Sequence, residues 1–205
     1  AICGAVLRTA SPYGTPIMAM ASTRAWMASK SSESFSSHGW VCYLPVIYAF
    51  GLIPLLELIL KPDAANLGQA EEEMARSNRA YDYVLYAIVL LQWPALIYYL
   101  RSMTASDLLL TDKIGRTVSM GLLCGTFGIN VGHELGHRSD KAEQWMAKLL
   151  LLSSLYMHFF IEHNKGHHKN VATPADPSSA RLNEPLFSFW FRTVLFSYLS
   201  AWKIA

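Results

Sequence analysis

Five of the seven histidines in this chain of 205 residues occur in two short clusters, HELGH at residues 133–137 and EHNKGHH at residues 162–168. In each cluster a histidine is followed by another four residues later, so on a helix the two imidazoles project from one face. Five imidazoles exceed the ligands of one tetrahedral zinc site. The spacing predicts a shared metal centre that holds one ion or two adjacent ions. The predicted ligands are His133, His137, His163, His167 and His168.

The first cluster also matches the HExxH pattern of zinc metalloproteases, in which two histidines bind zinc and the glutamate activates water. A metalloprotease needs one further ligand, whereas the second cluster supplies three more histidines. An intramembrane zinc protease is therefore the less favoured alternative. His158 has no partner at the same spacing and is interpreted as a packing residue or a neighbour of the ligands. His38 is assigned to the N-terminal segment.

Long apolar blocks must position these clusters. Hydrophobic residues make up 52% of the chain and charged residues only 16%, compared with about 25% charged residues in soluble domains. Residues 41–60, 83–100 and 117–132 contain a single charged residue, Glu57. The first block, about 20 residues long, matches a hydrocarbon core of about 30 Å, and we expect the other two to be further spans. We expect an all-α integral membrane protein, a multi-span helical bundle with the histidine clusters at one edge.

Two further apolar blocks follow the first cluster. Residues 149–161 would extend only about 20 Å as a helix, too short to cross the membrane. We expect this block to dip into the bilayer or lie along its surface, because a full crossing would place the two histidine clusters on opposite faces. Residues 186–205 are rich in aromatic residues and contain Arg192. They predict an interfacial helix or the beginning of another span.

Basic residues predict the orientation. They are more numerous on the side of the histidine clusters, which places that side in the cytoplasm. An acidic electron donor is expected to dock on the same face. The cationic residues expected to attract it are Arg138, Lys141, Lys165 and Lys169. The remaining basic residues of that side are Lys61, Arg76, Arg79 and Lys148, and the opposite connection contains Arg101, Lys113 and Arg116.

Composition excludes other classes of protein. A formal net charge of +2 gives little attraction to nucleic acid. The three cysteines form no CxxC pair, so these residues contain no disulfide framework and no rubredoxin-like module. Residues 1–39 are rich in Ala, Ser and Thr and form a poorly defined N-terminal segment with no assigned function.

HELGHR at residues 133–138 and EHNKGHHKNVATPADPSSAR at residues 162–181 resemble the first two histidine boxes of membrane alkane 1-monooxygenases, within the membrane fatty acid desaturase and hydroxylase class. The similarity extends upstream through GLIPLLELIL and AEEEMARSNRAYDYVLY, and so covers about residues 40–205. Desaturases usually share only the spaced histidines. The HHKNVATPADP continuation is similar to the alkane and xylene hydroxylase branch.

The resemblance implies an enzyme of alkane degradation in the bacterial inner membrane. It implies two non-haem iron ions, bound by the five histidines of the clusters, and O2 as co-substrate. Electrons would come from NAD(P)H through rubredoxin reductase and rubredoxin, and the products would be 1-alkanols from medium- or long-chain n-alkanes. Glu134 and Glu162 match motif positions but are not assigned as ligands.

The family's third histidine box and its NYxEHYG motif do not occur before Ala205. Residues 40–205 are therefore interpreted as an incomplete membrane di-iron oxygenase domain at the N-terminal end of the enzyme, and we expect them to be inactive alone. A fatty acyl desaturase or a xylene-type side-chain hydroxylase on the same fold is the main alternative. A non-catalytic membrane protein is a further one.

Overall fold

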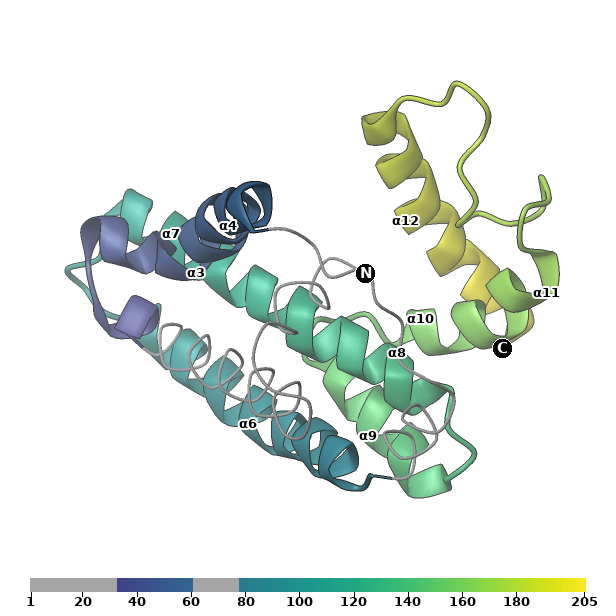
Figure 1. The fold of residues 1–205 in the computed structure, drawn as a ribbon, viewed down its shortest axis with the longest axis horizontal. Coiled ribbons are helices and arrows are strands. Elements are labelled where there is room, and N and C mark those ends of the chain that lie inside the picture. The colour runs from purple at the N-terminus through teal and green to yellow at the C-terminus, as the bar shows by residue number, and fades with distance from the viewer. Residues whose placement is uncertain (1–32, 61–77) are drawn as a thin grey trace. The chain divides into compact units, whose positions relative to one another are not determined.

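The computed structural model describes residues 33–60 and 78–205, and all regular elements in these ranges are helices. Most of the predicted N-terminal segment, together with Lys61 and Arg76, lies outside the described residues. The chain divides into two compact units, one ending at Thr126 and the other running from Phe127 to Ala205. Each unit in Figure 1 is therefore considered by itself.

Two helices of the first unit are long and apolar enough to cross a membrane. One is the helical stretch Gly39–Ile59, formed by η1 (Gly39–Tyr43), α3 (Leu44–Ile47), η2 (Tyr48–Leu52) and α4 (Ile53–Ile59). The other is α6 (Ala80–Ser102). Only 11% and 17% of their most apolar windows are buried, whereas a core helix of a soluble protein is mostly buried. The spans predicted at 41–60 and 83–100 are confirmed as long apolar helices.

The third predicted span, residues 117–132, is helical throughout but is not among these two helices. It falls on the consecutive segments α7 (Leu110–Leu123), η3 (Cys124–Ile129) and α8 (Asn130–Gly136). The uncharged stretch between Arg116 and His133 is shorter than the roughly 20 residues that usually cross a bilayer. A crossing at this position remains a prediction.

Helices α8 and α9 (Lys141–Leu152) pack side by side at the start of the second unit (Figure 1). Leu135, Leu150 and Leu151 are fully buried. Gly132 permits the close approach, because a Cβ there would lie 3.1 Å from the Leu151 side chain. A Cβ at Gly121 or Gly125, by contrast, would meet nothing within 4 Å.

The apolar block at residues 149–161 is not one short helix. Helix α9 ends at Leu152, and the chain turns through Leu155, whose φ is 56°. The Tyr156 amide then donates to the Leu151 carbonyl at 2.8 Å, and α10 begins at His158 (His158–Ile161). This turn reverses the chain before the second histidine cluster. The remaining segments are η4 (Glu162–His167), α11 (His168–Asn170) and α12 (Leu186–Ile204).

A buried carboxylate fixes the start of the first apolar helix in the first unit. Asp112 of α7 accepts hydrogen bonds from the Gly39 amide at 2.7 Å and from His38 Nδ1 at 2.9 Å. These bonds, the Gly39 amide first, hold the pKa of the Asp112 carboxyl below its usual range. His38, assigned from sequence to the N-terminal segment, is thus tied to α7.

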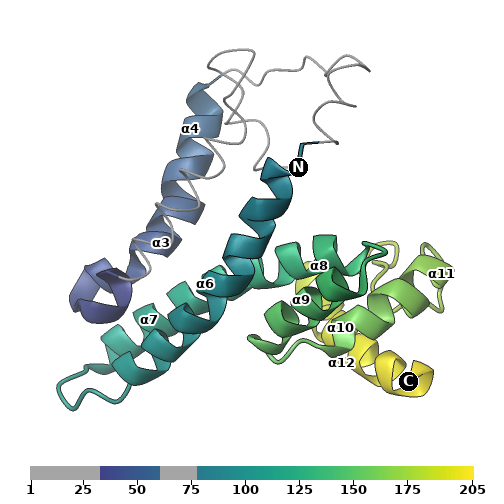
Figure 2. The same cartoon turned by 90° about the horizontal axis from the view of Figure 1, so that it is seen from below.

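Helix α7 also anchors α6. Arg116 of α7 is buried and donates to the carbonyls of Ser102 and Ser37, at 2.7 Å each. Tyr99 and Thr117 share a hydrogen bond of 2.9 Å between their hydroxyls. Figure 2 shows α6 and α7 running side by side from the loop that joins them.

Replacing Asp112 with Ala should loosen the residues around Gly39, because the amide and the His38 ring then lose their buried acceptor. Hydrogen–deuterium exchange of residues 38–43 should quicken roughly tenfold or more. Asp107→Ala is the matched control, because Asp107 is 73% exposed and its carboxylate lies 3.8 Å from His38. Equal exchange in the two variants would contradict the role given to Asp112.

Candidate metal centre

The second unit gathers all five predicted ligands into one group of rings. The centroids of neighbouring imidazoles are 4.4 to 5.8 Å apart. The other two histidines lie elsewhere: His38 contacts Asp112 in the first unit, and His158 packs edge-on against Tyr156 and Tyr198. The two clusters, 26 residues apart between His137 and His163, therefore form a single site.

The ring nitrogens converge closely enough to share a metal ion. His163 Nε2 lies 3.1 Å from the Nε2 atoms of both His137 and His168. The ligand atoms of His133, His137 and His163 all lie within 4.8 Å of one another. Imidazole nitrogens bind a metal such as zinc at about 2.1 Å, so two of them on one ion are roughly 3.0–3.4 Å apart. The residues present fit a metal centre.

Burial keeps these rings in the form that binds metals. It is the largest cause that lowers the pKa of His163 to about 4, and the neighbouring imidazoles His133, His168, His137 and His167 contribute in the same direction. Burial also lowers the pKa of His133. Both rings are therefore neutral at pH 7 and offer a lone pair, which is the form of histidine that metals bind.

Helix α8 carries the first cluster. His133 lies in its last turn and His137 follows its end, with their ring centroids 4.6 Å apart. The Phe160 ring packs over Gly136, where an added Cβ would make an ordinary contact of 3.4 Å with the ring. Glu134, the glutamate of the HExxH pattern, is exposed and lies 3.9 Å from Arg138.

A π-helical turn explains why His168 joins the site. At about 100° per residue, residues i and i+5 of an α-helix lie about 140° apart around the helix axis. The second cluster instead forms η4, a π-helix in which hydrogen bonds run from i to i+5. The wider turn brings His168 back over His163, while His167 stacks on His163 at 5.4 Å with an interplanar angle of 18°.

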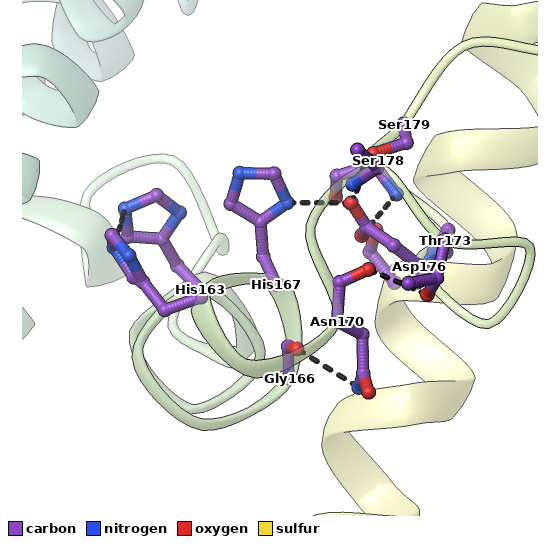
Figure 3. Close-up of polar contacts among 12 residues, drawn as sticks. His163, Gly166, His167, Asn170, Thr173, Asp176, Ser178 and Ser179 are labelled. Atoms are coloured by element: carbon purple, nitrogen blue, oxygen red, sulfur yellow. Dashed lines mark hydrogen bonds and ion pairs between the residues drawn. The ribbon is translucent and has the colours of Figure 1, made fainter.

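Asp176 holds His167 and was missed in the sequence analysis, although it lies within the quoted ATPADP stretch. His167 Nδ1 lies 2.8 Å from the Asp176 carboxylate (Figure 3). Burial opposes ionisation of Asp176, but hydrogen bonds from Ser179, Ser178 and His167 outweigh it and hold the pKa of this carboxyl below its usual range. The ionised carboxylate can only accept, so His167 carries its proton on Nδ1 and keeps the Nε2 lone pair free.

An ion pair fixes the loop that carries Asp176. Arg192 of α12 donates to both carboxylate oxygens of Glu184, at 2.6 and 2.7 Å, and to the carbonyls of Pro177 and Ser179. The hydrogen bond from Arg192 lowers the pKa of Glu184 to about 2. Arg192 thereby attaches the loop to α12 at Pro177, Ser179 and Glu184.

Glu162 is the first residue of η4, directly before His163 of the second cluster. Its side chain is buried, and its Oε1 atom has no hydrogen-bond partner among the described residues. A Cβ at Gly166 would lie only 2.6 Å from that oxygen and 3.1 Å from Ile204. Burial raises the pKa of the Glu162 carboxyl. The absence of a side chain at Gly166 thus leaves room for the Glu162 carboxyl and for Ile204 of α12 to pack against η4.

Comparison with known proteins connects this site to a family. Residues 115–205, which include both clusters, match the family model for fatty acid desaturases. The chain is 35% identical over 171 residues to alkane 1-monooxygenase 1 of Alcanivorax borkumensis, which covers 82% of this chain and 42% of that protein. It is 32% identical over 181 residues to alkane 1-monooxygenase of Pseudomonas putida, covering 87% and 43%.

A third relative, alkane 1-monooxygenase of Acinetobacter baylyi, is 35% identical over 153 residues, or 75% of this chain and 37% of its own. The chain thus spans less than half the length of these relatives. With the histidine clusters inside the matched region and the similarity extending over most of its length, the chain belongs to the fatty acid desaturase family, in the branch that contains the alkane 1-monooxygenases.

Proposed function

We propose that this protein is an integral-membrane, non-haem di-iron monooxygenase that converts medium- or long-chain n-alkanes to 1-alkanols with O2. The observation that carries the proposal is the convergence of His163 Nε2 with two other imidazole nitrogens at 3.1 Å. The relatives named alkane 1-monooxygenase supply the reaction class. The apolar helices Gly39–Ile59 and α6 support a place in a membrane. We propose the bacterial inner membrane, with the histidines towards the cytoplasm because the basic residues of the sequence favour that side.

The chemistry explains the choice of ligands. A terminal C–H bond of an alkane is strong and unpolarised, so bound iron would supply an oxidant derived from O2. Imidazole suits iron as a ligand. The proposed ligands are His133, His137, His163, His167 and His168, with Asp176 orienting His167.

An apolar ring borders the same cluster. Phe159 stacks on His163 with centroids 4.7 Å apart and an interplanar angle of 15°, and its centroid lies 6.0 Å from that of His133. An alkane presents no polar group for the protein to bind, so only apolar contacts can orient it. We infer that Phe159 forms part of the surface that receives the chain end.

Electrons would arrive from NAD(P)H through rubredoxin reductase and rubredoxin. Lys141, Lys165 and Lys169 are exposed and would attract an acidic carrier. Arg138, which the sequence groups with them, donates to Glu143 at 2.7 Å. Its charge is already balanced, so we leave it out of the proposed docking surface.

The alternative reactions are less well supported. In a zinc protease the glutamate of HExxH activates the metal-bound water, whereas Glu134 is exposed beside Arg138. A fatty acyl desaturase or xylene-type hydroxylase would use the same histidines. The named relatives favour the alkane reaction.

Metal analysis of the purified full-length protein should find about two iron ions per chain. His163→Ala should lower this content by at least half, because His163 lies at the centre of the cluster. His158→Gln is the control, since its ring lies outside the cluster, and it should retain the iron. Zinc as the sole metal would contradict the proposal.

Asp176→Asn should weaken iron binding about 10- to 100-fold, the usual effect of losing a carboxylate that orients a histidine ligand. It should also change the Mössbauer spectrum of the bound iron, because the electron donation from His167 falls. Glu184→Gln loosens the same loop without touching His167. Equal losses in both variants, with unchanged spectra, would show that Asp176 only stabilises the loop.

Reversing two exposed charges with Lys165→Glu and Lys169→Glu should raise the KM for reduced rubredoxin several-fold at low salt. The difference from the unchanged enzyme should shrink as salt screens the charges. Arg138→Gln should have a smaller effect, because Arg138 is paired with Glu143. An identical salt dependence in all three proteins would exclude this docking surface.

A further inference from the structure

An apolar groove lies in the second unit, apart from the histidine cluster. Its volume is about 770 Å³, within the range of about 300–1,000 Å³ typical of sites for one small ligand. The middle of α9, the turn after this helix, α10, η4 and the end of α12 line it. Its principal apolar residues are Trp145, Leu155, Met157, Phe160, Ile161 and Trp202.

One polar atom of the groove wall has no partner. His158 lines the groove, and its Nε2 atom is buried without a hydrogen bond to any described residue. Burial lowers the pKa of His158, so the ring is neutral at pH 7. A buried polar atom that makes no hydrogen bond destabilises the folded protein. A ligand with a hydrogen-bond acceptor would satisfy this nitrogen as an N–H donor.

Two cations also line the groove. Lys148 Nζ lies 4.7 Å from the Trp145 ring centroid and 4.9 Å from that of Phe160. Lys165 is exposed on η4. Among the described residues, neither lysine forms an ion pair with a carboxylate. The groove thus combines an apolar wall with unpaired positive charge, which complements an amphipathic anion.

We propose that this groove binds a single long-chain carboxylate. The alkyl chain lies along the apolar wall. The carboxylate accepts from His158 Nε2–H and attracts Lys148 and Lys165, whose flexible stems let their ammonium groups reach over the groove.

Two other occupants fit less well. An n-alkane has no acceptor for the histidine or the lysines. A phospholipid with two chains exceeds the usual size of a ligand in a site of this volume. Binding does not require metal, because none of the five proposed iron ligands lines the groove.

Displacement of a fluorescent fatty acid tests the ligand class. Full-length protein in phosphatidylcholine nanodiscs at pH 8 is titrated with 11-(dansylamino)undecanoic acid, which is then displaced with dodecanoate or 1-dodecanol. The two competitors have the same chain length and differ in charge. Dodecanoate should displace the probe at a concentration about tenfold lower. The result should be the same for iron-free protein, so failure here is distinguishable from failure of the proposed oxygenase function.

Variants locate the site. Exchanging Lys148 and Lys165 for Gln should weaken dodecanoate binding about tenfold and leave 1-dodecanol unchanged, whereas Lys141→Gln, outside the groove, should change neither. His158→Phe should weaken dodecanoate several-fold and raise the thermal midpoint of the free protein, because the unpaired nitrogen is removed.

Three results would overturn the proposal. One is equal binding of dodecanoate and 1-dodecanol to the unchanged protein. Another is the same loss of dodecanoate binding in Lys141→Gln as in the double variant. The third is the absence of saturable probe binding, which would assign the groove to another part of the chain or to membrane lipid.

Discussion

The close approach of ring nitrogens from separate histidines is the constraint that governs the second unit. His163 Nε2 lies 3.1 Å from the Nε2 atoms of His137 and His168, and on a bound metal ion these nitrogens would all present lone pairs, which repel one another. Packing elsewhere must therefore supply the positions: Gly132 sets α8 against Leu151, and Gly166 leaves room for Ile204 of α12. Because packing fixes these positions, little conformational entropy would be lost when an ion binds.

Local backbone geometry does as much for the site as residue type. The turn at Leu155 reverses the chain, so two clusters separated by an apolar block meet in one place. The π-helical turn of η4 then lets residues at i, i+4 and i+5 face the same point, which an α-helix does not permit. Without either feature, the same five histidines would divide into smaller groups.

The sequence predicts those parts of the structure that depend on local patterns. Apolar length predicts the helix at Gly39–Ile59 and α6, and four-residue spacing predicts the paired rings of each cluster. It does not reveal contacts between distant residues, such as Asp112 with Gly39 or Asp176 with His167. Nor does the sequence identify Gly132 as the glycine that lets α8 approach α9, because that depends on which helix packs opposite.

The ion pair between Arg192 and Glu184 persists to a lower pH than the unprotonated form of His163 does. A carboxyl with a depressed pKa favours the folded state above about pH 4.5 and loses that effect as the pH falls towards 2. The imidazole of His163 accepts a proton near pH 4 when no metal is bound. On acidification His163 would thus lose its lone pair while the Asp176 loop was still attached to α12. Neutralisation would restore this ligand without refolding of the loop.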